Sequence, residues 1–534
     1  MKMFLSKRLC FVILFLLTSF QIHPQEKDFS VRTFIQILND KNLSDEEREK
    51  AVDNLESIKA TDKETIAALI NCLSDKNPFL VGRAVKALTK IGKPAIENLV
   101  SALQNEDESI RWGASIVFSK LGKEASPALP YLIEALKDKN ENIRYCSAIA
   151  LGNLETVSSP AVIEIQKLLF DSDDDVRWAA HFSLNKIEKK ALHYPVDLAA
   201  KISAVDSLTP VLMKELKVPG VSVSIISDYK LVSSKQFGLA NVNEKIPVTS
   251  ESVFEACSMT KPMFAYVALK LVDEGKLDLD KPLYNYLEEK FICENNYDKL
   301  ITARMILSHS SGLPNWRKGE EEREGPIPIY FKPGTQFSYS GEGMFYLQRV
   351  IEKITGESLN ALSRRILFVP LGLTHTSFVW TNEIDSFISA GHDTAGNYLT
   401  RSKYTHANSA YTLYTTPEEY AKFLVEIMRP GRNENSSLSE KMKEEMITPQ
   451  VGVYVREPID RPGNALGLSV SWGLGWAIDS TASGKIIYHS GANRTGFRCY
   501  SQFNPAKGSG IVIMTNGLNG SDLWRRIISN IGDL

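Results

Sequence analysis

The chain has 534 residues, which is too long for a single hydrophobic core and indicates two or three domains. Its hydrophobic fraction of 43% and charged fraction of 24% are typical of a soluble globular protein. The net charge of −2 excludes the strongly basic character of a whole-chain nucleic-acid-binding protein, so no nucleic-acid partner is expected.

The first 25 residues have the pattern of a secretory signal peptide. Lys2, Lys7 and Arg8 supply a positive end, and an apolar run over residues 9–20 follows them. Because that run is short for a membrane span, we expect a secreted or periplasmic protein. An uncleaved N-terminal anchor is the alternative, and only then would the chain contact a membrane.

Residues 30–190 contain an internal repeat. Arginines recur in steps of 33 residues, at Arg111, Arg144 and Arg177, and apolar residues within each copy follow helical spacing. This pattern resembles HEAT repeats and predicts an all-α solenoid, in which each helical hairpin buries its apolar face only against its neighbours. The solenoid is either a protein-binding arm or a rigid spacer; the sequence does not choose between them.

Residues 195–534 predict an α+β domain. Two strand-like runs occur early, at residues 221–226 and 230–237, and strands return only near the end, at residues 475–478, 486–489, 499–503 and 511–514. Helical and loop segments occupy roughly residues 275–450, and a last helix is expected from about residue 522 to 531. We therefore expect an antiparallel sheet whose two halves are distant in sequence, flanked by helices and a helical subdomain.

Ser258 and Lys261 lie three residues apart at the start of an apolar, helix-forming run. A lysine held in an apolar pocket has a lowered pKa and can act as a base toward a neighbouring hydroxyl. The spacing alone is weak, because it also occurs at Ser183 with Lys186 and at Ser227 with Lys230. A solvated serine and lysine is the ordinary interpretation of any single pair.

Three further motifs make the pattern specific. In order, the four are Ser258-Met259-Thr260-Lys261, preceded by Phe254-Glu255-Ala256; Ser308-His309-Ser310-Ser311-Gly312-Leu313-Pro314; Phe337-Ser338-Tyr339-Ser340-Gly341; and His489-Ser490-Gly491, followed by Gly496-Phe497. With these motifs, residues 195–534 resemble the serine β-lactamase and D,D-peptidase superfamily, which includes penicillin-binding proteins, and most closely its class C and esterase-like branch.

The resemblance implies a β-lactamase/transpeptidase-like fold and an acyl-enzyme mechanism. By resemblance, Ser258 is the nucleophile, Lys261 accepts or relays its proton, and Tyr339 acts with the lysine as base and then as acid. The backbone N–H groups of Ser258 and Ala492 would bind the oxyanion. A buried core tyrosine is the ordinary alternative for Tyr339. The motif at His309 is interpreted as a structural turn, outside the catalytic set.

Two positions depart from the family pattern. His489 and Ser490, followed by Gly491, stand where penicillin-recognising enzymes carry Lys-Thr-Gly, and histidine is fully charged only below a pKa of about 6.5. We therefore expect weak capture of a substrate carboxylate at neutral pH; a strand histidine that only forms hydrogen bonds is the alternative. Gly341 stands where Tyr-x-Asn enzymes carry asparagine, which weakens a strict β-lactam or D-Ala-D-Ala assignment.

The sequence indicates no metal and no cofactor. It contains no His-Glu-x-x-His motif, no paired Cys-x-x-Cys motifs and no phosphate-binding glycine loop. The six cysteines become five without Cys10, a set that allows one disulfide but is no disulfide framework.

The resulting expectation is a secreted serine hydrolase that acts on a small ester, a D-amino-acid peptide or a β-lactam. A true β-lactamase or D,D-carboxypeptidase is one alternative. A non-catalytic scaffold that binds a protein partner through the solenoid is the other, and the intact set of Ser258, Lys261 and Tyr339 argues against it.

Overall fold

The computed structural model describes residues 24–171, 173–187, 197–288, 292, 297–317, 326–431, 438–453, 470–481 and 484–532. Residues 1–23 of the predicted signal peptide, which spans residues 1–25, therefore lie outside the described residues. The chain divides into two compact units, Met1–Tyr131 and Leu132–Leu534. No helix within the described ranges is both long and apolar enough to cross a membrane.

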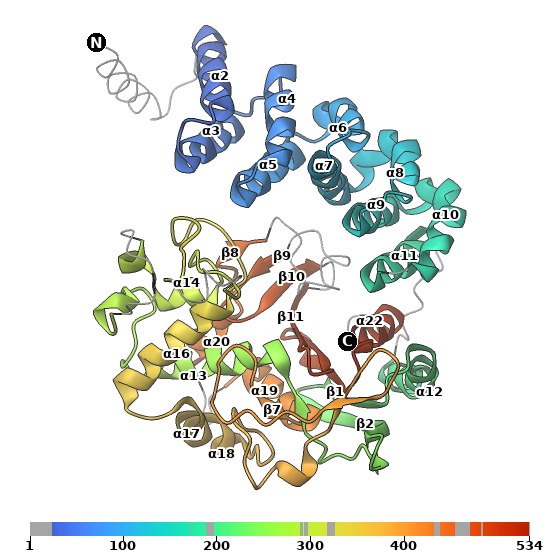
Figure 1. The fold of residues 1–534 in the computed structure, drawn as a ribbon, viewed down its shortest axis with the longest axis vertical. Helices are drawn as coiled ribbons and strands as arrows, with labels where there is room; N and C mark the ends of the chain where they lie inside the picture. The colour runs from blue at the N-terminus through green and yellow to red at the C-terminus, as the bar shows by residue number, and fades with distance from the viewer. Residues whose placement is uncertain are drawn as a thin grey trace. The chain divides into compact units, whose positions relative to one another are not determined.

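The N-terminal region is built from short helices in antiparallel pairs, drawn from blue to teal in Figure 1. Side chains of the connecting turns cap these helices: Ser44 forms a capping box with Glu47, and Asp62, Asp107 and Asn140 each accept a backbone N–H of the following helix. The helices are α2 Pro24–Asn39, α3 Asp45–Ser57, α4 Lys63–Asn71, α5 Pro78–Ile91, α6 Ile96–Leu103, α7 Glu108–Leu121, α8 Leu129–Ala135, α9 Glu141–Asn153, α10 Val162–Lys167 and α11 Asp174–Ile187. The predicted all-α repeat region is confirmed.

One of the recurring arginines, Arg144, joins successive repeats. Arg144 forms a two-pronged ion pair with Asp171, at 2.7 and 2.8 Å, and donates to the carbonyl of Asp138. Arg48, which lies outside that series, forms a single ion pair with Asp75 at 2.6 Å, again 27 residues further along the chain. Both arginines are largely buried, so each charge-assisted bond gives the guanidinium a partner where contact with water is limited.

The C-terminal domain is organised around one nine-stranded antiparallel sheet in the order β3-β2-β1-β13-β12-β11-β10-β9-β8. The strands are β1 Gly220–Ser227, β2 Lys230–Asn241, β3 Ile246–Pro247, β8 Val451–Gly452, β9 Val470–Trp472, β10 Ala477–Thr481, β11 Gly484–Ala492, β12 Arg498–Asn504 and β13 Ser509–Thr515. Because β1 pairs with β13, with Val223 opposite Ile513, the two halves of the sheet join as predicted. The very short strands β8 and β9 were not predicted.

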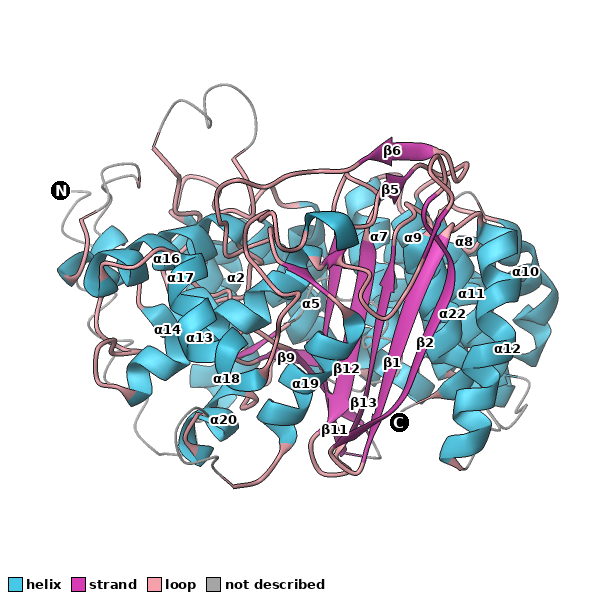
Figure 2. Ribbon diagram, turned by 90° about the horizontal axis from the view of Figure 1, so that it is seen from below, coloured by secondary structure: helices cyan, strands magenta, loops and turns pink. Residues whose placement is uncertain are grey.

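Helices cover both faces of this sheet (Figure 2). One face packs against α12 Leu198–Leu216 and α22 Gly520–Ile531, and the other against a helical region. The alternation along β13 shows both cores at once, because Ile511 and Ile513 belong to one and Val512 and Met514 to the other. The helices of the second face are α13 Thr260–Asp273, α14 Ala303–Leu307, α16 Gly341–Thr355, α17 Leu359–Ser363, α18 Val369–Leu371, α19 Pro417–Met428 and α20 Glu440–Met446.

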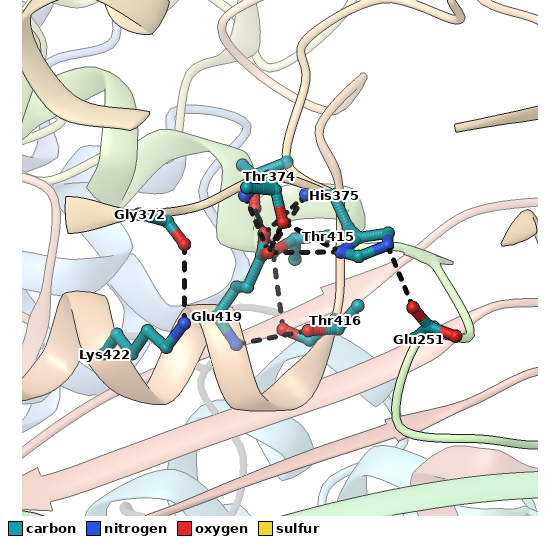
Figure 3. Close-up of polar contacts among 9 residues, drawn as sticks. Glu251, Gly372, Thr374, His375, Thr415, Thr416, Glu419 and Lys422 are labelled. Carbon is teal, nitrogen blue, oxygen red and sulfur yellow. Dashed lines mark hydrogen bonds and ion pairs between the residues drawn. The ribbon is translucent and has the colours of Figure 1, made fainter. Parts of the chain in front are cut away.

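The buried carboxylate of Glu419 anchors residues 374–376. Glu419 of α19 accepts the backbone N–H groups of Thr374 and His375 and the hydroxyl of Thr376, which lies 2.7 Å from the hydroxyl of Thr415 (Figure 3). Thr415 ends β7 Tyr414–Thr415, and β7 pairs with β4 Phe254–Glu255. The strand that leads into Ser258 is therefore fixed through α19.

Candidate active site

Ser258 lies in a single 3-10 turn, Cys257–Met259, that runs directly into α13. Its side chain is partly exposed, whereas the helix behind it is buried along nearly its whole length. Cys257 adopts a left-handed conformation with φ 53°, which is costly for a residue with a side chain. Such strain beside a nucleophile is typical of sites where the surrounding structure dictates the backbone.

Lys261 is completely buried, and its amine points at the hydroxyl of Ser258. Its Nζ lies 3.1 Å from Ser258 Oγ and donates to the carbonyl of Ala410 at 2.8 Å. Burial lowers the pKa of the Lys261 amine from 10.5 to about 7. The amine is therefore poised to accept a proton near neutral pH, as a base within contact of a hydroxyl must be.

Tyr339 completes the group that the sequence singled out. Its side chain is buried, and Lys261 Nζ lies 4.6 Å from the centroid of its ring. The ring also packs against the rings of Trp472 and His489, with centroid distances of 5.6 and 6.2 Å. The structure thus brings Ser258, Lys261 and Tyr339 together, while their catalytic roles stay a prediction.

Strand β11 passes directly against the turn that holds Ser258. A Cβ placed on Gly491 would lie 2.5 Å from the carbonyl oxygen of Ala256 and 3.0 Å from the nitrogen of Ser258, so only glycine fits there. Residues 489–492 pair with β12, whereas the pairing of β10 with β11 ends at Tyr488. The exposed Ala492 that follows is where the second oxyanion N–H was predicted.

His489 is buried and uncharged. Its Nδ1–H donates to the carbonyl of Ser490 at 2.6 Å, and burial, together with the nearby Lys261, lowers its pKa to about 3. The sequence predicted a side chain that titrates near pH 6.5. The fold moves that titration far below neutral pH, so His489 supplies no positive charge for a substrate carboxylate.

The space beside Gly341 is filled by the loop that follows Pro314. A Cβ at Gly341 would lie 2.7 Å from the ring of Trp316 and 2.9 Å from the carbonyl oxygen of Asn315. Asn315 also holds this position, because its side-chain and backbone oxygens both accept the N–H of Gly341 at 3.1 Å. The asparagine of Tyr-x-Asn enzymes has no room here.

Glu255 is a buried residue to which sequence reasoning assigned no role. Its Oε2 accepts three bonds: from Tyr404 OH at 2.8 Å, Asn493 Nδ2 at 2.9 Å and Thr495 Oγ1 at 2.7 Å. Burial raises the pKa of this carboxyl group. Glu255 therefore ties the strand before Ser258 to the loop after Ala492. The sequence offered one indication of this role, which is an acidic residue within an apolar stretch. Nothing in the sequence marked the three residues that bond to it.

Among the described residues, no group of three or more His, Cys, Asp or Glu side chains could hold a metal ion. Within the part of the chain that the structure describes, Cys72, Cys146, Cys257 and Cys499 are not joined in disulfides. Cys257 and Cys499 lie together, because both thiols contact the carbonyl oxygen of Glu255 at 3.3 Å.

Comparison with known proteins agrees with this architecture. The Beta-lactamase family profile matches residues 205–531, and a HEAT-repeat profile matches residues 31–119 and 96–185. Protein flp of Staphylococcus aureus strain N315 is 24% identical over 312 residues, which are 56% of this chain and 60% of that relative. This chain therefore spans less than two thirds of that relative. A Beta-lactamase of Pseudomonas fluorescens is 23% identical over 349 residues, which are 58% of this chain and 92% of that relative.

Among solved structures, the octameric penicillin-binding protein homologue from Pyrococcus abyssi superimposes with a TM-score of 0.52 and 25% identity, over 62% of this chain and 78% of that one. Class C β-lactamases share the fold at 19% and 20% identity. Fold and motifs together define a serine-hydrolase domain of the β-lactamase and penicillin-binding-protein type, preceded by HEAT repeats. Because the family profile covers more than half of its residues, this chain belongs to the Beta-lactamase family.

Proposed function

We propose that this chain is a serine hydrolase, secreted or periplasmic, that forms an acyl-enzyme on Ser258 and cleaves an ester or amide. The observation that carries the proposal is the contact of 3.1 Å between Ser258 Oγ and Lys261 Nζ, whose pKa burial lowers to about 7. A partly exposed hydroxyl beside a buried amine is the arrangement that nucleophilic catalysis without histidine requires.

The reaction follows from this arrangement. Ser258 Oγ attacks the substrate carbonyl while its proton passes to Lys261, and the N–H groups of Ser258 and Ala492 would hold the oxyanion. Collapse of the tetrahedral intermediate breaks the bond to the leaving group, which takes a proton through Tyr339. Water then attacks the acyl-enzyme, its hydroxyl becomes part of the released acid, and its other proton passes to Ser258 Oγ.

Two features favour an uncharged ester over a carboxylate-bearing β-lactam or D-amino-acid peptide. His489 is neutral at physiological pH, because its pKa is about 3, and therefore offers no cation to a carboxylate. Trp316 and Asn315 fill the place of the asparagine that contacts the substrate amide in Tyr-x-Asn enzymes. The named Beta-lactamase relative supports β-lactam hydrolysis as the second candidate.

Intact-mass spectrometry distinguishes these candidates. We expect a fluorophosphonate adduct on wild-type protein and none on Ser258→Ala, with turnover of a chromogenic short-chain ester. Stable acylation or turnover of penicillin would favour the second candidate. Absence of any adduct, together with a Ser258→Ala variant that keeps its cellular phenotype, would contradict catalysis and support a scaffold that binds a protein through its HEAT repeats.

A further inference from the structure

His309 holds the backbone on both sides of Tyr339. Its carbonyl oxygen accepts the N–H of Ser338 at 2.7 Å, and its Nδ1 accepts the N–H of Ser340 at 3.1 Å. The two residues that flank the tyrosine are thus bonded to one histidine from a separate loop. Ser340 also caps α16, because its hydroxyl accepts the N–H of Gly343. The backbone of Tyr339 is therefore held in place on both sides.

The imidazole ring also packs on the phenol itself. The ring centroids of His309 and Tyr339 lie 4.2 Å apart with a tilt of 37°, the shortest centroid distance of any ring pair at this site. Trp472 closes the other side of the histidine at 5.0 Å, and Phe337 lies at 6.0 Å. His309 is completely buried, so the surrounding side chains fix the position of its ring.

Two unusual features occur together at His309. The residue adopts a left-handed conformation with φ 56°, which is uncommon for any residue other than glycine. Because Nδ1 accepts a hydrogen bond, the proton of the neutral ring lies on Nε2, which is buried and has no hydrogen-bond partner within the described part of the chain. Buried donors without partners are rare, and such outliers cluster at functional sites.

The ring has to stay uncharged for this arrangement to hold, because a proton on Nδ1 would remove the acceptor for Ser340. Burial and the neighbouring Lys261 and His489 lower the pKa of His309 well below 6.5. The histidine can therefore support the tyrosine over the whole neutral range without adding a charge beside Lys261.

We propose that His309 is a positioning residue for Tyr339, which it holds beside Lys261 through the two flanking backbone bonds and the packed ring. The inference rests on the proposed acyl-transfer function and extends it to a residue whose motif suggested a turn. On this proposal His309 acts through Tyr339 and takes no part in the bond-making steps itself.

A double-mutant cycle tests whether His309 acts through Tyr339. His309→Phe keeps a ring but removes the acceptor for Ser340, and we expect kcat for ester turnover to fall about 10-fold or more with KM nearly unchanged. In a Tyr339→Phe background the same change should cost less than about twofold, because the group that it positions is already gone. A purely structural role would lower kcat by the same factor in both backgrounds.

His309→Asn guards against a folding defect, because asparagine tolerates the left-handed conformation and its side-chain oxygen can replace Nδ1 as the acceptor. We expect it to recover most of the kcat lost in His309→Phe. His392→Asn is the matched control: His392 is equally buried and its Nδ1 bonds to the carbonyl of Asn516. Its effect on kcat should be small and the same in both backgrounds.

The outcomes separate the two proposals. If wild-type protein forms no adduct on Ser258 and turns over no ester, the proposed function is wrong and this inference falls with it. If wild-type protein is acylated but His309→Phe lowers kcat by the same factor with and without Tyr339, only the positioning role is wrong. A non-additive cycle with recovery by asparagine supports both.

Discussion

At the scale of single residues, burial decides the protonation of the site. Lys261 and His489 are both buried and both lose basicity, but to different extents: the lysine pKa falls to about 7 and the histidine pKa to about 3. The lysine therefore changes charge near neutral pH, while the histidine stays neutral. Neither value can be derived from the residue type, because each depends on which neighbours exclude water.

Acylation of Ser258 should rise with pH as Lys261 loses its proton. Because the base is active only when unprotonated, the rate of fluorophosphonate labelling should be low at pH 5, increase about 10-fold per pH unit below the pKa and level off above a midpoint near pH 7. Stopped-time labelling between pH 5 and 9 measures this curve. A second inflection near pH 6.5 from His489 is not expected, and its presence would contradict the neutral histidine.

Gly341→Ala should disturb the loop beside the active site. Its new Cβ would meet Trp316 and the backbone oxygen of Asn315 below 3 Å, and overpacking of this kind costs about 1–3 kcal/mol. Urea unfolding measures the loss. Gly82→Ala is the control, because nothing lies within 4 Å of a Cβ there and alanine favours a helix. Equal stability of the two variants would show that the space beside Gly341 is open.

At the scale of elements, the site is assembled where three segments meet: the strand and turn before α13, the free end of β11 and the segment before α16. Their contacts are made by backbone as much as by side chains. Gly491 lets β11 touch the turn that holds Ser258, and Glu255 ties the strand before that turn to the loop after Ala492. A change at either contact should alter the position of Ser258 relative to Ala492.

Glu255 offers a matched pair of variants. Its Oε2 accepts all three bonds and its Oε1 has no partner within the described residues, so the amide of Glu255→Gln can place its oxygen where Oε2 lies. We expect Glu255→Gln to change the free energy of unfolding by less than about 1 kcal/mol, and Glu255→Ala to lower it by about 3 kcal/mol because three donors lose their acceptor. Denaturant unfolding distinguishes them. Equal losses would mean that the negative charge, not the bonds, is needed.

At the scale of the whole molecule, burial of Lys261 lowers the stability of the C-terminal domain. A lysine with a folded pKa near 7 and an ordinary value of 10.5 binds fewer protons in the folded state between these pH values. Stability should therefore increase with pH through this window, and the penalty is largest below pH 7, where both states are protonated.

Replacement of Lys261 by methionine should remove that cost. We expect Lys261→Met to be inactive yet more stable than the wild type by about 2 kcal/mol at pH 6, with the difference shrinking toward pH 10. Thermal and denaturant unfolding of both proteins across this pH range measures the effect. A constant difference would show that the lysine is not strongly desolvated in the folded protein.

Much of the architecture could be predicted from local patterns. The 33-residue recurrence of arginine revealed the repeats, and the runs that became β1, β2, β10, β11, β12 and β13 were long and apolar enough to recognise. Strands of two or three residues, such as β8 and β9, have too few positions for any periodicity. Ser258, Lys261 and Tyr339 could be singled out because motifs surround them.

The amino-acid sequence by itself determined the class of this protein, because four motifs in a fixed order and a helical repeat can be recognised from residue types and their spacing alone. Only the tertiary structure decided the state of the site. The neutrality of His489, the convergence of three donors on Glu255 and the two bonds by which His309 brackets Tyr339 join residues far apart in the chain. They depend on burial and contact distance, and neither exists until the sheet and helices have packed.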